Sequence, residues 1–215
     1  VDRVASITRS LVAFEEGALG PDKDCGYEGP YMKAIAGIPI SMEGKTAACA
    51  HLSPVGNIPA ACCDLWSNES VTNIRLLSDM APTVYLEQLI YDTRLMNQAV
   101  QQETVIELRS LFVGSDVHYD PQAFILDPQI VVPVAKAALE AENEVQGTVR
   151  AVETALDLIE EAVSEGRLEL SDRESVWIPQ IREAVASIPD NEAEFVEQML
   201  PEIDTEVVTL SEYGL

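Results

Sequence analysis

A regular spacing of apolar residues after residue 145 is the sequence feature that most constrains the fold. These residues recur every three or four positions: Val149, Val152, Leu156, Ile159 and Val163. Such spacing places side chains on one face of an α-helix. Gly166 follows, and glycine commonly ends helices because it adopts the left-handed backbone conformation. The pattern predicts a long helix that ends at Gly166.

Further helix signals follow this segment. Ser171 with Glu174, and Asn191 with Glu194, have the spacing of a capping box. Prolines at positions 189 and 201 bracket the last helical stretch. We therefore expect residues 148–200 to be predominantly helical and separate from any catalytic layer. Residues 136–215 are predicted to form an acidic α-helical C-terminal region.

The sequence before residue 135 has a different character, with glycine, proline, cysteine and other small residues. Short apolar runs alternate with Gly/Pro pairs, which is typical of buried strands alternating with helices. Residues 23–26 and 38–42 are the candidate strands, and Pro30 is well placed in the first turn of a helix between them. Strand, helix, strand is the unit of a parallel sheet, so an α/β fold is expected here. Residues 83–99 are predicted to form a longer amphipathic helix.

Composition restricts the function classes. The formal net charge of −24 disfavours binding to nucleic acid or anionic membranes, and no apolar run reaches the length of a membrane span. The irregularly spaced cysteines do not form a disulfide framework, so a cytoplasmic location is expected. The chain lacks an initiator Met and a signal peptide, and we expect it to begin within a longer protein.

Several reactive residues have simpler interpretations. Residues 43–46 resemble the end of a phosphate-binding loop, but Pro39 stands where that motif needs glycine. Adjacent helical side chains point about 100° apart, so Cys62 and Cys63 cannot easily bind one metal ion together. Buried cysteine usually behaves as a small hydrophobic residue, so both of them and Cys49 are expected to pack in a core. His51 and His118 are the only histidines, too few for a multi-histidine zinc site. Each is expected to make a local structural hydrogen bond.

Cys25 lies in another context, after Asp24 and before Gly26, at the carboxyl end of the first candidate strand. Catalytic groups of α/β barrels lie at the carboxyl ends of their strands. A thiolate at this position can bind zinc, and the neighbouring glycines would leave room for a substrate. An ordinary buried thiol is the alternative interpretation.

The same region carries a resemblance to the methanol:corrinoid methyltransferase family, in its zinc-containing, methanol-activating subunit. Residues 24–31 read DCGYEGPY, residues 38–52 read IPISMEGKTAACAHL, residues 62–70 read CCDLWSNES and residues 90–97 read IYDTRLMN. The likeness is specific over about residues 22–98. The DPQAF stretch from Asp120 and the closing EYGL are similar but less distinctive.

The resemblance implies a TIM-type barrel with added helices. One glutamate and two cysteines of that family hold zinc at the strand ends, and Cys25 resembles the second cysteine. The other two ligands would lie upstream of Val1. A complete barrel takes about 250 residues, so residues 1–135 would be the C-terminal part of such a barrel, with residues 22–70 forming consecutive strand and helix elements. The chain is thus predicted to be a partial TIM-type barrel followed by a helical appendage.

The resemblance also implies a reaction. Hydroxide is a poor leaving group, so methyl transfer from methanol needs a Lewis acid on the oxygen and a strong nucleophile at carbon. Zinc would supply the first, and Co(I) of a corrinoid on a partner protein the second, within a hetero-oligomer. Asp24, Glu28, Glu43 and Lys45 are candidates for supporting the zinc ligands or handling protons, or are simply structural.

Two other interpretations remain. The chain could be a non-catalytic acidic helical scaffold or interaction module with packed cysteines, and zinc content would distinguish this scaffold from the enzyme. It could also carry the corrinoid itself. The sequence lacks the Asp-x-His-x-x-Gly motif expected of a cobalt ligand, which disfavours the corrinoid carrier.

Overall fold

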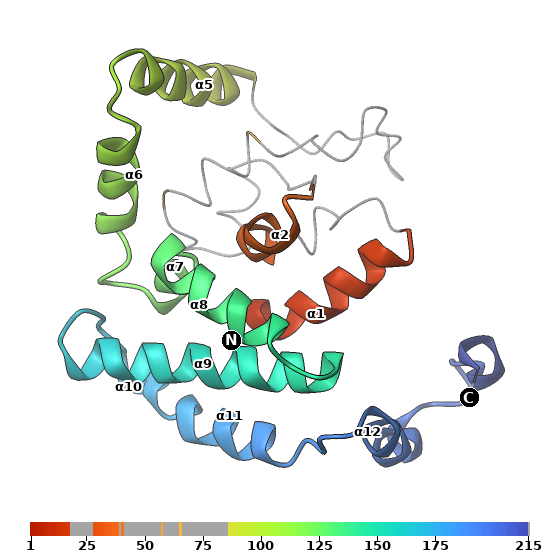
Figure 1. Ribbon diagram of the computed structural model, residues 1–215. Coiled ribbons are helices and arrows are strands. Elements are labelled where there is room, and N and C mark those ends of the chain that lie inside the picture. Colours follow the sequence, from red (N-terminus) through yellow and green to blue (C-terminus); the bar gives the residue numbers. More distant parts are fainter. Residues whose placement is uncertain (18–27, 39, 41–56, 58–64, 66–85, 215) are drawn as a thin grey trace.

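The computed structural model describes residues 1–17, 28–38, 40, 57, 65 and 86–214. Within these ranges the secondary structure is entirely helical, and no β-strand occurs (Figure 1). The helices and 3-10 turns are α1 (Asp2–Glu15), α2 (Gly29–Ala36), α5 (Leu86–Gln101), α6 (Val105–Gly114), α7 (Pro121–Phe124), α8 (Pro128–Leu139), α9 (Glu144–Ser164), α10 (Asp172–Ser175), α11 (Trp177–Ala186), α12 (Glu192–Met199), η2 (Leu200–Glu202) and η3 (Leu210–Tyr213). Among the described helices, none is long and apolar enough to cross a membrane.

The helix predicted before Gly166 is α9, and it is the centre of the helical body. Helices α1 and α8 lie along one side of it and α11 along the other (Figure 1). Gly166 adopts a left-handed backbone with φ of 71° directly after the helix, as expected for a helix end. The Asn143 side chain accepts a hydrogen bond from the Gln146 N–H and so caps its beginning.

The buried face of α9 differs from the predicted one. Val152, Leu156 and Ile159 are buried as expected, but Val163 is 38% exposed. Small residues complete the buried face instead: Gly147, Ala151, Ala155 and Ala162. The prediction counted only large apolar residues, so it missed the small residues of the buried face. Alanine and glycine belong there because they allow neighbouring helices to approach closely.

Gly147 is the position where this close approach is tightest. A Cβ atom on this residue would lie 3.0 Å from the carbonyl oxygen of Ala138, at the end of α8, and 3.1 Å from Cγ2 of Thr8 on α1. The Thr8 and Thr148 hydroxyls also hydrogen-bond each other across this contact. A side chain at this position would therefore have to displace the end of α8 or the Thr8 side chain.

The helix ends predicted from capping residues are present. The Ser171 side chain accepts a hydrogen bond from the Glu174 N–H, and the Glu174 side chain accepts one from the Ser171 N–H, which makes a complete capping box. Asn191 accepts hydrogen bonds from the N–H groups of Ala193 and Glu194 at the start of α12. The helical prediction for residues 148–200 is confirmed.

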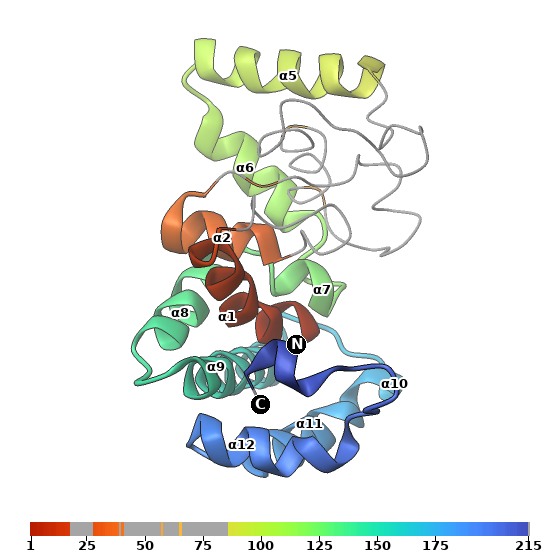
Figure 2. The ribbon, with the colours of Figure 1, turned by 90° about the vertical axis from the view of Figure 1, so that its right-hand side faces the viewer.

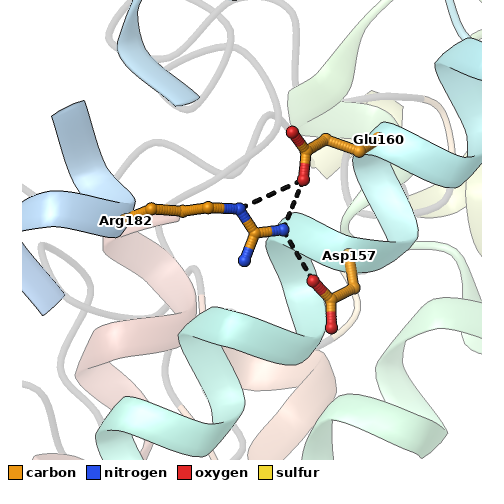
Figure 3. A network of polar contacts seen from close by, with 3 residues as sticks. All are labelled: Asp157, Glu160 and Arg182. Atoms are coloured by element: carbon orange, nitrogen blue, oxygen red, sulfur yellow. Dashed lines mark hydrogen bonds and ion pairs between the residues drawn. The ribbon is translucent and has the colours of Figure 1, made fainter. Parts of the chain in front are cut away.

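Helix α11 packs on α9 through both apolar and charged contacts. Val185 is buried against the common core, with Ile178 and Ile181 partly buried beside it. On the rim, the Arg182 guanidinium reaches two carboxylates of α9 (Figure 3). Its Nη2 lies 2.6 Å from Oδ1 of Asp157, and its Nε lies 3.1 Å from Oε2 of Glu160. These ion pairs are partly exposed, so they add little to stability and the apolar contacts carry most of the packing.

The helices after residue 135 share one hydrophobic core with those before it. Residue 135 itself lies inside α8. The core joins residues of α1 and α2, such as Val4, Ile7 and Tyr31, with residues of α8 and α9. Helix α9 is therefore packed against the N-terminal helices. Helices α5 and α6 lie at the end of the molecule opposite α11 and α12 (Figure 2).

Two of the predicted elements before residue 135 are confirmed. Helix α2 has Pro30 in its first turn, as expected, and α5 covers most of the helix predicted for residues 83–99. The predicted strand at residues 23–26 lies outside the described residues. Of the second predicted strand, only Ile38 and Ile40 are described, and both are buried but belong to no strand.

The difference between Val152 and Val163 predicts the effect of shortening each side chain. Val152→Ala should lower the free energy of unfolding by about 2 kcal/mol, because it removes two methyl groups from a closed core. Val163→Ala should change it by less than about 0.5 kcal/mol. Urea unfolding followed by circular dichroism measures both. Equal losses would mean that α9 buries the face predicted from its large apolar residues.

Gly147 predicts a second matched pair. Gly147→Val should destabilise the fold by about 1–3 kcal/mol, because its side chain meets the backbone of α8. Gly114→Val is the control, since nothing lies within 4 Å of a Cβ at Gly114, and the change should be within about 0.5 kcal/mol. The same unfolding measurement compares them. A stable Gly147→Val variant would show that α8 and α9 can move apart.

Candidate functional site

Most residues predicted to take part in chemistry lie outside the described residues. Cys25, the predicted zinc ligand, is among them. So are the other candidates and decoys of the same region: Asp24, Glu43, Lys45, Cys49, His51, Cys62 and Cys63. Glu28 is the described member of the four charged candidates, and His118 is the described histidine. The candidate site is therefore built from Glu28, three residues after Cys25.

Glu28 lies at the start of α2, with its side chain turned toward α1. Its carboxylate is 3% exposed and accepts a hydrogen bond of 2.5 Å from the Ser10 hydroxyl. The Arg9 guanidinium lies 4.0 Å away, on the solvent side. Although Glu28 precedes α2, its side chain does not cap this helix. The carboxylate instead joins α2 to α1.

Burial raises the pKa of the Glu28 carboxyl above its ordinary value of 4.5, because a charged group loses hydration when it is buried. The hydrogen bonds from the Ser10 hydroxyl and from the backbone N–H of Glu28 itself, and the positive charge of Arg9, act in the opposite direction but are weaker. The buried carboxyl is thus only partly compensated for its lost hydration.

Tyr31 holds α2 from a second direction. Its side chain is fully buried, and its hydroxyl donates a hydrogen bond of 2.5 Å to the carbonyl oxygen of Ile125, directly after α7. Burial raises the pKa of the Tyr31 phenol, so this group remains a donor. Gly37 ends the helix with a φ of 60°, in the left-handed region. Helix α2 is therefore fixed at its first turn by contacts to α1 and to the α7–α8 junction.

Sequence reasoning did not identify Ser10, although a signal was present. Val4, Ile7 and Ser10 follow one another at intervals of three residues, and all three are buried in α1. A serine on an otherwise apolar helix face indicates a buried polar partner, because an unpaired hydroxyl is costly in a core. That partner is Glu28.

His118 makes the structural contacts predicted for it. Its Nδ1 lies 3.1 Å from the carbonyl oxygen of Arg167, and its Nε2 lies 3.5 Å from Oε1 of Glu169. The Glu169 N–H also donates to the His118 carbonyl oxygen. These contacts tie the segment after α6 to the segment after α9. The role of His118 is structural, as expected, but its hydrogen bond is not local, because it joins residues 49 positions apart in the sequence.

The described residues alone do not form a metal site. Within them, no group of three or more histidine, cysteine, aspartate or glutamate side chains could hold a metal ion. The predicted zinc ligand Cys25 lies outside this part of the chain. The described geometry thus fixes Glu28 and α2, which follow Cys25 in the sequence.

Comparison with known proteins supports the resemblance noted in the sequence. The profile of the family described as methanol-cobalamin methyltransferase B subunit matches residues 1–214. Methanol–corrinoid protein co-methyltransferase of Methanosarcina barkeri is 38% identical over 210 residues, which cover 96% of this chain and 45% of the relative. The chain therefore spans less than half the length of this relative.

A solved structure is similar over nearly the whole chain. The crystal structure of the methanol:cobalamin methyltransferase complex MtaBC from Methanosarcina barkeri superposes with a TM-score of 0.78 and 38% sequence identity. The match covers 99% of this chain and 47% of that one. The resemblance found from residues 24–97 thus extends over the helical region as well. On these grounds, the chain belongs to the methanol-cobalamin methyltransferase B subunit family.

Proposed function

We propose that this chain is part of an enzyme that transfers the methyl group of methanol to the cobalt of a corrinoid protein. The observation that carries the proposal is the 38% identity to a methanol–corrinoid protein co-methyltransferase over 96% of the chain. The alternative of a non-catalytic acidic scaffold is less well supported, because the similarity includes the segment around Cys25 as well as the acidic helices.

The proposed contribution of this chain is the C-terminal part of a TIM-type barrel together with the helices that follow. Residues 1–135 would supply the last barrel elements, and residues 136–215 the helical region. The support is the similarity to the MtaBC structure over 99% of this chain, which covers less than half of the matched chain. A complete barrel needs about 250 residues, so additional chain would be required to close it.

Cys25 is the residue proposed to act directly at the reaction centre, as a thiolate ligand of zinc. Zinc with an open coordination position would act as a Lewis acid on the methanol oxygen. Cysteine must be deprotonated to bind the metal. The other ligands of a three-ligand site would have to come from residues upstream of Val1. The described contacts of Glu28 and Tyr31 would keep α2, which follows Cys25, in a fixed position.

The proposed partner is a protein that carries the corrinoid, so the active form would be a hetero-oligomer. The support is the MtaBC neighbour, which is a methanol:cobalamin methyltransferase complex. Separating zinc and corrinoid on two proteins means that the methyl group moves only when the two are assembled. Nucleic acid and anionic membranes are disfavoured as partners by the net charge of −24.

The role of Cys25 predicts a loss of both zinc and activity on substitution. In the intact protein, Cys25→Ala should lower the zinc content and abolish methylation of Co(I) corrinoid, because one of the metal ligands is removed. Metal analysis measures the first effect, and the absorbance of the cobalt measures the second. Cys62→Ala is the matched control, which should mainly perturb packing and retain zinc.

The two measurements separate the possible failures of this proposal. Full zinc content with near-normal methylation in Cys25→Ala would show that Cys25 is not a ligand, and Cys49 would then be tested. If the wild-type protein neither binds zinc nor methylates Co(I) corrinoid, the alternative of a non-catalytic acidic scaffold is favoured instead.

A further inference from the structure

We propose that residues 190–214 form a strap that detaches from the helical body as one unit. The strap comprises α12, η2 and η3 with their connections. The side chains of Asn143 and Gln146 form a clasp that holds it, against the repulsion among its own acidic side chains. Detachment leaves α9 and its core intact. The inference goes beyond the proposed function and involves neither zinc nor corrinoid.

The strap contributes no residue to the buried core. Val185 on α11 is buried, and no described residue after it is buried. Val207 and Tyr213 are 80% and 71% exposed. Helix α12 packs mainly against η2, the turn that follows it, and lies beyond the end of α11 (Figure 1). Shared burial of apolar surface is what makes helices unfold together, so the strap is able to open while the core stays closed.

Two side chains at the start of α9 hold the start of the strap. Nδ2 of Asn143 and Nε2 of Gln146 both donate to the carbonyl oxygen of Asp190, at 3.1 Å and 3.2 Å. Within the described part of the chain, every other hydrogen bond of the strap joins two of its own residues. The two bonds to Asp190 are therefore the polar attachment of the strap to the body.

Asn143 links this attachment to the start of α9. Its Oδ1 accepts a hydrogen bond from the Gln146 N–H and caps α9, while its Nδ2 donates to Asp190. Because the oxygen faces a donor and the nitrogen faces an acceptor, the amide fits in one orientation. Asn191, the next residue of the strap, caps α12 in the same way. The clasp thus joins the first turns of two helices, and the turn of α9 is held by the close packing of Gly147 on α8.

Electrostatic repulsion opposes the clasp. The strap carries eight aspartate or glutamate residues and no lysine, arginine or histidine, in a chain with a net charge of −24. None of the ion pairs between described residues includes a carboxylate of the strap. Dissolved salt screens such repulsion, since the Debye length falls from about 30 Å at 0.01 M to about 8 Å at 0.15 M. The strap is therefore held more tightly as the ionic strength rises.

Hydrogen–deuterium exchange of the intact protein, resolved by mass spectrometry of peptides from α12 and α9, measures the opening. Helix α12 is eight residues long, and isolated helices of this length are unstable in water, so its amides exchange whenever the strap detaches. We expect α12 to exchange at least about 100-fold faster than the middle of α9. Raising the ionic strength from about 0.02 M to about 0.5 M should slow the exchange of α12 at least about threefold.

Asn143→Asp and Gln146→Glu test the clasp. Each keeps the size of the side chain and replaces the donating NH2 group with an oxygen, and aspartate remains a good helix cap. Each should speed exchange in α12 by about three- to tenfold, the range for loss of one hydrogen bond, and the increase should persist at high salt. Exchange in the middle of α9 should change less than about twofold. Circular dichroism checks that each variant is folded.

Gln129→Glu is the matched control. It adds the same charge in the first turn of α8, where the exposed Gln129 side chain makes no hydrogen bond with another described residue, and it should leave α12 unchanged within about twofold. Equal effects of Gln129→Glu and Gln146→Glu would overturn the clasp, because added charge alone would then explain both. Exchange of α12 as slow as that of α9, or unaffected by salt, would overturn the strap. So would faster exchange of the whole of α9 together with α12 in the clasp variants.

Discussion

The close packing of α9 against α1 and α8 is the constraint on which the rest of the helical body depends. It is possible because the buried face of α9 is largely glycine and alanine, so the backbones approach until a Cβ at Gly147 would lie 3.0 Å from a carbonyl oxygen of α8. Helix α1 held in this way carries Ser10, and Ser10 holds Glu28. A contact between helix backbones thus supports the position of Glu28 at the start of α2.

The sequence predicted the existence of helices better than their surroundings. The helix ends were predictable because a capping box and a left-handed glycine are local chemistry, visible at Ser171, Glu174 and Gly166. The buried face of α9 was not, because alanine carries no strong hydropathy signal and burial depends on the neighbouring helices. The composition changes near residue 135, but this residue lies inside α8, because a change of composition does not have to coincide with the end of a helix.

The candidate site was predicted from two kinds of information. Cys25 was identified by resemblance to a family, since its sequence context alone favoured an ordinary packed thiol over a ligand. Glu28 was named only as one of several charged candidates, and its contact with Ser10 joins residues 18 positions apart. Such pairings depend on how two helices dock, which local sequence does not encode. The family match supports the proposed chemistry. The contacts of Glu28 and Tyr31 show how α2 is held in the fold.

The buried carboxyl of Glu28 also links docking of α1 and α2 to proton uptake. Since burial raises its pKa above 4.5, the folded chain binds this proton more tightly than the unfolded chain does. The contribution of Glu28 to the free energy of unfolding is therefore greatest below pH 4.5, and it declines as the pH rises through the raised pKa of the folded chain. In a chain with a net charge of −24, one carboxyl that favours folding on acidification opposes the usual behaviour of surface acids in ion pairs. Protonation of Glu28 therefore favours, rather than opposes, the docking of α2 on α1.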